Sequence, residues 1–242
     1  MLHSASKAFF HLLARIDPLK ALASRYGMRH PSSFARRFIA GESIEEAIAA
    51  AREVEGRGFL QTLDYLGESV TSLAAADAAT REYLRIIGAV VASGIGRNLS
   101  LKLTQLGLDV DRAICVDNLR KILKTAAQCN FFVRIDMESS AYTDATLDIF
   151  ETVWKLGHHN TGVVLQSCLH RTEKDLERVN ALGARIRLVK GAYREPKSVA
   201  YQLKADVDDA FLKLARRLLS AGVYPAIATH DPQILDQSIE QQ

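Results

Sequence analysis

The sequence predicts an α/β fold, a (βα)₈ TIM-type barrel that is incomplete here, with about six βα units preceded by N-terminal helices. Short apolar and β-branched runs alternate with longer stretches of helical spacing, which is the order of a parallel sheet with right-handed crossovers. In addition, reactive polar residues follow several of the apolar runs, and barrel enzymes carry their sites at the C-terminal ends of the strands.

An open dinucleotide-binding sheet is the competing architecture. Such a sheet should carry a glycine-rich turn directly after an early strand. The glycine-rich piece of this sequence, residues 93–98, lies before a strand candidate and lacks the third glycine. We therefore predict that it is a loop and favour the barrel.

Residues 1–57 are predicted to form an N-terminal helical segment. Ser43 followed by Glu46 has the spacing of a capping box, and we expect this helix to end near Gly56. The first 15 residues are amphipathic. They fit a helix that packs on the domain, a peripheral membrane contact, or a targeting segment without the features of a secretory signal.

Residues 58–242 are predicted to form the incomplete barrel. We expect strands at 59–68, 99–104, 131–138, 162–168, 185–190 and 224–231. Helical patterns lie near 69–93, 109–128, 142–156, 171–182 and 200–221, and another begins after Pro232. A complete barrel of eight units takes about 250 residues. Six units are expected between residue 58 and residue 242, so about 60 residues that would form the last two units are absent. We expect a truncated or split chain, or a barrel completed by a C-terminal fragment.

Composition excludes several classes of function. The net charge is +3, from 31 basic and 28 acidic residues, which gives no electrostatic footprint for nucleic acid. The three cysteines have no CxxC spacing, so we predict neither a disulfide framework nor a metal site. The longest mostly apolar run, 84–95, is shorter than the roughly 20 residues of a membrane span. We expect a cytoplasmic protein that contacts the inner membrane at most peripherally.

Lys190 and Asp136 are the polar residues hardest to explain as surface positions. Lys190 ends an apolar strand and fits a Schiff-base nucleophile, an anion contact or a salt bridge. Arg187 should lie on the opposite face of that strand from Lys190. Asp136 needs a cationic partner if it is buried, and Lys102 on the neighbouring strand is the expected one.

Two further strand ends carry uncharged or weakly basic groups. Gln166 ends a fully apolar strand, where its amide suits a heteroaromatic ligand such as a flavin, although core amides of this kind are also common. His230 precedes Asp231 and Pro232, a pattern typical of a helix N-cap. Because no second metal ligand lies at a suitable spacing, a metal at His230 is rejected.

Several motifs in order resemble the proline dehydrogenases, the flavoenzymes that oxidise L-proline. The motifs are RIDMES (134–139), GVVLQSCLHRT (162–172), RLVKGAYREP (187–196) and ATHDP (228–232). The segments FARRFIAGESIEEAI, LDYLGES and NLSLKLTQLG are similar to that family as well, so the resemblance covers nearly the whole chain. It is closest to a bacterial single-function member, and it implies a (βα)₈ barrel with FAD at its mouth.

The resemblance also implies roles for individual residues. Asp136 and Arg187 would be catalytic, with Arg187 near the flavin N5, while Lys102 would pair with the proline carboxylate and Tyr193 would wall the substrate pocket. The implied FAD contacts are Met137, Gln166, Lys190, Gly191, Ala192, Thr229 and His230.

The implied reaction is hydride transfer from proline to FAD, which yields 1-pyrroline-5-carboxylate, and the electrons would pass to a quinone. The family's pattern continues beyond 228–232 with two further strands and a final helix that bears two adjacent arginines, and this sequence ends at Gln242 without that helix. Two alternatives to a working proline dehydrogenase stay open. The chain could be a fragment that is inactive alone, or a Schiff-base lyase that uses Lys190.

Overall fold

The computed structural model describes residues 39–240, and it divides the chain into two units, residues 1–61 and 62–242. The amphipathic segment 1–15 lies outside the described residues. In the first unit, helix α3 (Ile44–Gly56) begins after Ser43, whose Oγ accepts a hydrogen bond from Glu46 N at 3.2 Å. Glu46 Oε2 in turn accepts one from Glu42 N at 3.0 Å. The predicted capping residues therefore start this helix, and the proposed domain boundary at residue 57 stays a prediction.

The second unit contains one parallel sheet of six strands. They are β1 (Leu63–Asp64), β2 (Asn98–Leu101), β3 (Phe132–Ile135), β4 (Thr161–Gln166), β5 (Arg185–Val189) and β6 (Ala226–Ile227). Each strand pairs in parallel with the next one along the chain, so their order in the sheet is their order in the sequence. All six strands fall within or beside the predicted ranges, and the predicted barrel class is confirmed.

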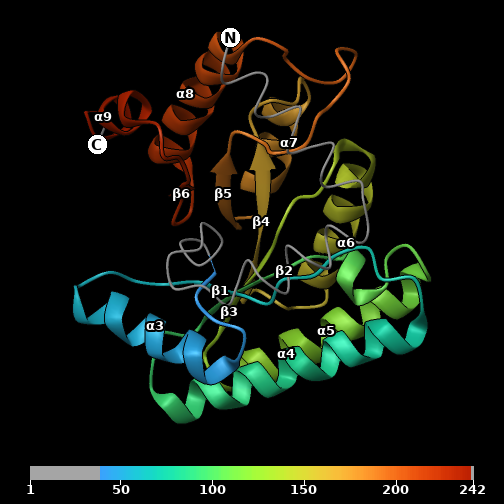
Figure 1. Cartoon of the computed structure of the whole chain (residues 1–242). Helices are drawn as coiled ribbons and strands as arrows, with labels where there is room; N and C mark the ends of the chain where they lie inside the picture. Colours follow the sequence, from blue (N-terminus) through green and yellow to red (C-terminus); the bar gives the residue numbers. More distant parts are fainter. Residues whose placement is uncertain (1–38, 241–242) are drawn as a thin grey trace, which may run out of the picture. The chain divides into compact units, whose positions relative to one another are not determined.

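A helix follows each strand. They are α4 (Leu73–Ser93), α5 (Arg112–Gln128), α6 (Thr143–Lys155), α7 (Thr172–Asn180), α8 (Lys204–Ala221) and α9 (Pro232–Ile239), with short 3₁₀ turns η2 (Thr104–Leu106) and η3 (Ser140–Tyr142). Helices α4 and α5 run side by side in Figure 1. As predicted, Asp231 caps α9, because its Oδ1 accepts a hydrogen bond from Gln233 N and Pro232 is the first helical residue. The glycine-rich piece 93–98 is mainly the predicted loop, starting with Gly94 as the C-cap of α4.

The two faces of the sheet differ in character because side chains alternate along a strand. Leu101, Ile135 and Val163 share one register level and are fully buried. They belong to the face on which the helices pack, and burial of each such side chain stabilises the fold by about 1.5–3 kcal/mol. The opposite face carries Arg134 and, one level nearer the C-terminal ends, Asp136. The sheet therefore has an apolar outer face and a polar inner face.

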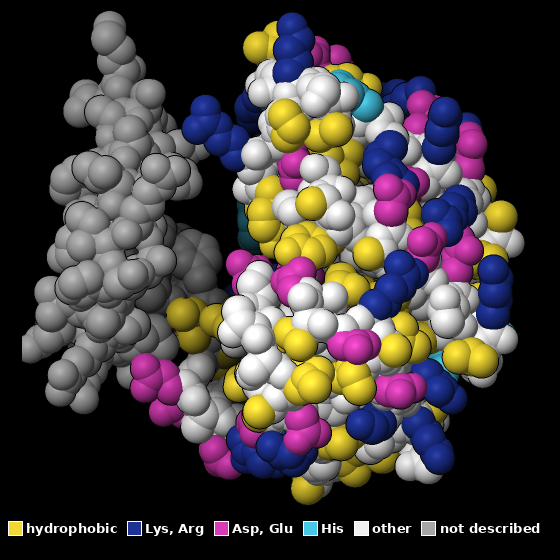
Figure 2. Space-filling view, turned by 90° about the vertical axis from the view of Figure 1, so that its right-hand side faces the viewer, with side chains coloured by type: hydrophobic (Ala, Val, Ile, Leu, Met, Phe, Trp, Pro, Cys, Tyr) yellow, Lys and Arg dark blue, Asp and Glu magenta, His cyan; other side chains and the backbone are white. Residues whose placement is uncertain are grey.

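The surface carries charges of both signs. On the face shown in Figure 2, Lys and Arg side chains are interspersed with Asp and Glu side chains. Between α6 and α7, for example, Arg178 Nη2 lies 3.0 Å from Asp148 Oδ1 and also pairs with Glu151. Within residues 39–240, no helix is long and apolar enough to span a bilayer.

Candidate functional site

A cavity of about 440 Å³ lies at the C-terminal ends of the strands. It is lined by all eleven residues that the sequence singled out: Lys102, Asp136, Met137, Gln166, Arg187, Lys190, Gly191, Ala192, Tyr193, Thr229 and His230. These residues come from five different strand ends and are separated by up to 128 positions in the sequence, from residue 102 to residue 230. The structure brings the predicted site residues into one place, and their individual roles stay predictions.

The strand register explains why these residues meet. Val164 is paired with Arg187, and Arg187 with Ala226, so these three side chains lie at one level on one face of the sheet. Asp136 extends β3 to the same level, since Ile135 is paired with Val163. The cavity wall repeats this two-residue spacing in Val164 and Gln166, and in Arg187 and Val189.

Asp136 and Arg187 form an ion pair in the cavity. Arg187 Nη1 lies 3.2 Å from Asp136 Oδ1, and about one fifth of each side chain is exposed. Burial raises the pKa of Asp136, and the positive charge of Arg187 opposes that rise. The expected partner was Lys102, and this expectation was wrong. Arg187 reaches across β4 and makes the direct contact, while Lys102 acts on Asp136 through longer-range electrostatics.

Lys190 lies on the opposite face of β5 from Arg187, as alternation predicted. Its Nζ lies 2.6 Å from Asp208 Oδ1 on α8 and 3.0 Å from Asp231 Oδ2 at the start of α9. Neither carboxylate lines the cavity. Of the three uses considered for Lys190, the structure shows the salt bridge.

Gln166 and Gly191 form one side of the cavity. Gln166 is 2 % exposed, and its Nε2 donates a hydrogen bond to the carbonyl of Glu138 at 2.8 Å. Gly191 has φ +109°, and a Cβ there would lie 2.4 Å from Cys168 Sγ and 3.0 Å from Gln166 Oε1. Both the backbone angle and the space therefore require glycine at this position.

The loop that follows β5 is held to two other strand-end loops. Tyr193 Oη donates a hydrogen bond to Glu68 Oε2 at 3.4 Å. Burial, together with the negative charge of Glu68, raises the pKa of Tyr193 to about 12. Two residues on, Glu195 Oε1 accepts a hydrogen bond from Ser140 N at 2.7 Å, and its Oε2 accepts one from Ser140 Oγ. These contacts keep the Tyr193 ring at the cavity wall.

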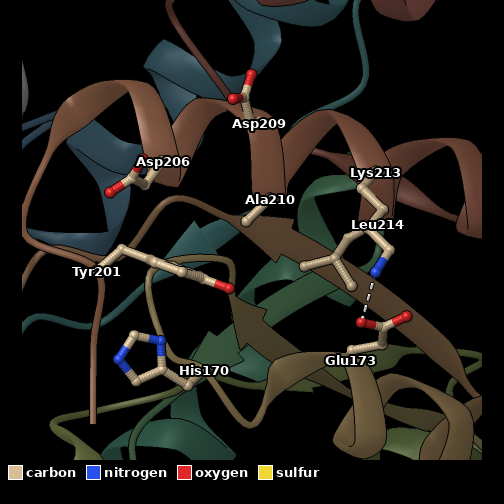
Figure 3. A pocket seen from close by; sticks show the side chains of 8 residues that line it. All are labelled: His170, Glu173, Tyr201, Asp206, Asp209, Ala210, Lys213 and Leu214. Carbon is tan, nitrogen blue, oxygen red and sulfur yellow. Dashed lines mark hydrogen bonds and ion pairs between the residues drawn. The ribbon is translucent and has the colours of Figure 1, made fainter. Parts of the chain in front are cut away.

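A second pocket, of about 310 Å³, lies between the loop after β4 and α8 (Figure 3). His170 and Tyr201 pack edge to face there, with ring centroids 4.5 Å apart. Lys213 Nζ donates to Glu173 Oε2 at 2.7 Å on the other side. None of the predicted site residues lines this pocket, and most of its polar side chains are exposed. The first cavity is therefore the candidate site.

Sequence reasoning missed four residues in or beside the site. Val164, Val189 and Ala228 line the cavity. Alternation along the predicted strands 162–168, 185–190 and 224–231 could have found them. Asp208 was missed because it lies on a helix, although its i, i+4 spacing from Lys204 was a signal of a helical ion pair.

Comparisons with known proteins agree with one another. The family model described as proline dehydrogenase matches residues 47–241. Proline dehydrogenase 2 of Bacillus subtilis (strain 168) is 38% identical over 231 residues, which cover 96% of this chain and 75% of that protein. Proline dehydrogenase of Deinococcus radiodurans is 40% identical over 208 residues, which cover 84% of this chain and 67% of that protein.

Solved structures show the same fold. Proline utilization A from Bdellovibrio bacteriovorus, in a form inactivated by N-propargylglycine, superposes with a TM-score of 0.78 at 23% identity. The match covers 86% of this chain and 26% of that one. The chain thus spans about three quarters of the Bacillus relative and about a quarter of this larger protein.

Proposed function

This chain belongs to the proline dehydrogenase family, and we propose that it oxidises L-proline to 1-pyrroline-5-carboxylate with FAD as the hydride acceptor, the first step of proline catabolism. The observation that carries the proposal is the gathering of eleven predicted residues around one cavity at the strand ends. Family membership shows an oxidoreductase of the proline dehydrogenase type. FAD, the quinone and the roles of the residues are proposed.

The cavity fits the ring system of a flavin in size and chemistry. Its volume of about 440 Å³ is within the range of ligand pockets, and valine, methionine and alanine side chains make up part of its wall. Gln166 supplies an amide, and the absence of a side chain at Gly191 allows a ligand to approach the backbone closely. Lys190, Ala192, Met137, Thr229 and His230 would hold FAD together with these two residues.

Bound FAD would supply the two-electron acceptor, and the protein supplies orientation and charge. Arg187 would place a positive charge where negative charge develops during hydride transfer. Asp136 neutralises Arg187 in part and fixes the guanidinium through the 3.2 Å contact. The ion pair thereby keeps the cationic group in place before substrate arrives.

Lys102 and Tyr193 would bind the substrate. Lys102 offers an ammonium group to the proline carboxylate, a charge-assisted contact that determines which end of the ring faces the acceptor. The Tyr193 ring would close one side of the pocket and exclude water. No strong general base is required if L-proline binds as the free amine, because the hydride leaves from the ring carbon beside nitrogen and the nitrogen proton is lost to solvent.

The Schiff-base alternative is disfavoured by geometry. A lysine nucleophile must present its amine to the substrate in the cavity. The Nζ of Lys190 instead contacts Asp208 and Asp231, two carboxylates outside the cavity lining. Borohydride should therefore trap no carbonyl substrate on Lys190.

We further propose that a membrane quinone reoxidises the flavin through peripheral contact. This proposal rests on the family and on the amphipathic pattern of residues 1–15. The test is sedimentation of the full chain together with lipid vesicles, in which the fraction of protein bound to the vesicles is compared with and without a reduced flavin.

The visible spectrum of the chain with added FAD, before and after anaerobic addition of L-proline, tests the proposed function. We expect flavin bands that L-proline bleaches and D-proline does not. Flavin bands that persist with L-proline would count against oxidation by this chain. Lack of any bound flavin would count against the cofactor.

A further inference from the structure

Four charged residues form a cluster outside the cavity, which we call the charge cluster: Lys190, Lys204, Asp208 and Asp231. Lys190 Nζ lies 2.6 Å from Asp208 Oδ1 and 3.0 Å from Asp231 Oδ2. Lys204 Nζ lies 2.9 Å from Asp231 Oδ2 and also pairs with Asp208. Each lysine therefore contacts both carboxylates.

The charge cluster joins both ends of one loop. Lys190 ends the strand region before the loop, and Lys204 is the first residue of α8 after it. The loop between them carries Gly191, Ala192 and Tyr193 of the cavity wall. Because the two lysines share the same carboxylates, the loop is closed at its base.

The charge cluster also includes the segment that carries Thr229 and His230. Asp231 follows His230 directly, its backbone N donates to Thr229 Oγ1 at 3.1 Å, and its Oδ1 caps α9. One carboxylate thus connects two separate parts of the cavity wall, the segment after β5 and the segment after β6. Backbone hydrogen bonds also hold this loop. Cys168 N donates to Lys190 O at 2.9 Å at its base, and Tyr201 N donates to Cys168 O at 2.8 Å in its far part.

The charge cluster is partly buried, which makes its ion pairs less screened than surface pairs. The side chains of Lys190, Asp208 and Asp231 are 25%, 20% and 17% exposed, whereas Lys204 is 71% exposed. Burial alone would raise the pKa of Asp208, but hydrogen bonds from Lys190 and Lys204 outweigh it and lower that pKa. The pKa of Asp231 is also lowered, by hydrogen bonds from Lys204 and Lys190.

We propose that Asp208 is a positioning residue for the cofactor: through the charge cluster it holds the Lys190–Ala192 backbone and the Thr229–His230 segment in place for FAD binding. This inference rests on the proposed function for the identity of the ligand. Asp208 itself does not line the cavity, so its effect reaches the ligand through Lys190 and Asp231.

The test compares Asp208→Asn with Asp209→Asn, a matched control one residue along α8 that lies outside the charge cluster. FAD affinity is measured by fluorescence titration, and the thermal midpoint is measured without FAD. We expect about tenfold weaker FAD binding in Asp208→Asn, equal to about 1.4 kcal/mol, and wild-type affinity in Asp209→Asn. The thermal midpoints of both variants should stay close to that of the wild type.

Equal FAD affinity in Asp208→Asn and wild type would overturn the proposal. So would a fall in affinity that follows only a general loss of stability. If Asp208→Asn does not fold, Lys204→Met removes an exposed member of the same cluster. About threefold weaker FAD binding is then expected, and wild-type affinity would overturn the proposal.

Hydrogen exchange separates this inference from the proposed function. Without FAD, the backbone amide of Cys168, which donates to Lys190 O at 2.9 Å, should exchange about tenfold faster in Asp208→Asn than in Asp209→Asn, because the anchor of Lys190 is weakened. A wild-type chain that binds no FAD would count against the proposed cofactor, while the exchange comparison would still decide whether the charge cluster positions this segment. Equal exchange in both variants would overturn the positioning role.

Discussion

Arg187 Nη1 lies 3.2 Å from Asp136 Oδ1, although β3 and β5 are separated by β4. The contact forms because Val164, the residue of β4 at this level, is short and the arginine side chain is long enough to pass it. The guanidinium is thus held at the cavity wall by a carboxylate two strands away. A shorter cation on β5 would not reach Asp136 from this strand position.

Replacing Arg187 with methionine should lower kcat for L-proline by about 100-fold or more, because a preorganised positive charge in the cavity is lost. The measurement is steady-state turnover with an artificial electron acceptor at saturating FAD. Arg194→Gln is the control, since Arg194 is exposed and does not line the cavity. A kcat of Arg187→Met above half the wild-type value would contradict the proposed role.

Replacing Lys102 with methionine should raise the KM for L-proline by about 10- to 100-fold, since a charge-assisted hydrogen bond contributes about 1.5–3 kcal/mol. FAD affinity should not change. Lys124→Met on α5 serves as the control, because Lys124 is exposed and lies outside the cavity lining. If KM is unchanged while FAD binding weakens, Lys102 contacts the cofactor and not the substrate.

Replacing Gly191 with alanine should abolish most FAD binding and destabilise the fold by about 1–3 kcal/mol, since φ +109° is unfavourable for alanine and the new Cβ meets Cys168 Sγ. The matched control is Gly183→Ala. Gly183 also has a positive φ, +72°, but nothing lies within 4 Å of its added Cβ. Denaturant unfolding should show destabilisation in both variants, and FAD titration should show lost affinity only in Gly191→Ala. Equal FAD affinities would refute the close-approach role of Gly191.

Replacing Glu138 with glutamine should change how stability depends on pH. Burial raises the pKa of Glu138 above its ordinary value of 4.5, even though Thr104 donates hydrogen bonds to both carboxylate oxygens, from N at 3.2 Å and from Oγ1 at 2.6 Å. The folded wild type therefore binds more protons than the unfolded chain in the window just above 4.5, and its stability falls as pH rises through that window.

Glu138→Gln lacks this loss. Its unfolding free energy, measured in urea from about pH 4 to about pH 7, should gain on that of wild type through the window and then run parallel to it. The loss of one acceptor for Thr104 adds an offset that does not depend on pH. A constant difference across the whole range would show that Glu138 titrates normally in the folded chain.

Local pattern was enough to predict most of the fold. The strand runs 131–138 and 162–168 contain β3 and all but the first residue of β4, because β-branched and apolar residues in short runs pack well only in a buried sheet. The observed strands are shorter than predicted at their C-terminal ends. Asp136 N still donates to Leu101 O at 2.8 Å, but the residues after it leave the ladder and enter the loops of the cavity mouth. This change depends on pairing with a neighbour and not on local propensity.

Two ion pairs, that of Asp136 and that of Lys190, could not be predicted from local sequence pattern. Lys102 was the expected partner of Asp136 because neighbouring strands are usually in contact, yet side chains two strands apart can meet on the inner face of a curled sheet. Asp208 was overlooked because no strand pattern points to it. Its link to Lys190 exists only once α8 has packed against the sheet.

Residue order along the chain determined the class of fold, the family and the set of residues at the strand ends, since each depends on local periodicity or on motifs that are contiguous in the sequence. Tertiary structure alone decided that Asp136 pairs with Arg187, that Lys190 turns to Asp208 and Asp231, and that Tyr193 contacts Glu68. These contacts join residues 18 to 125 positions apart, the latter for Tyr193 and Glu68. Strand register and helix packing determine such distances, and both result from the whole chain folding together.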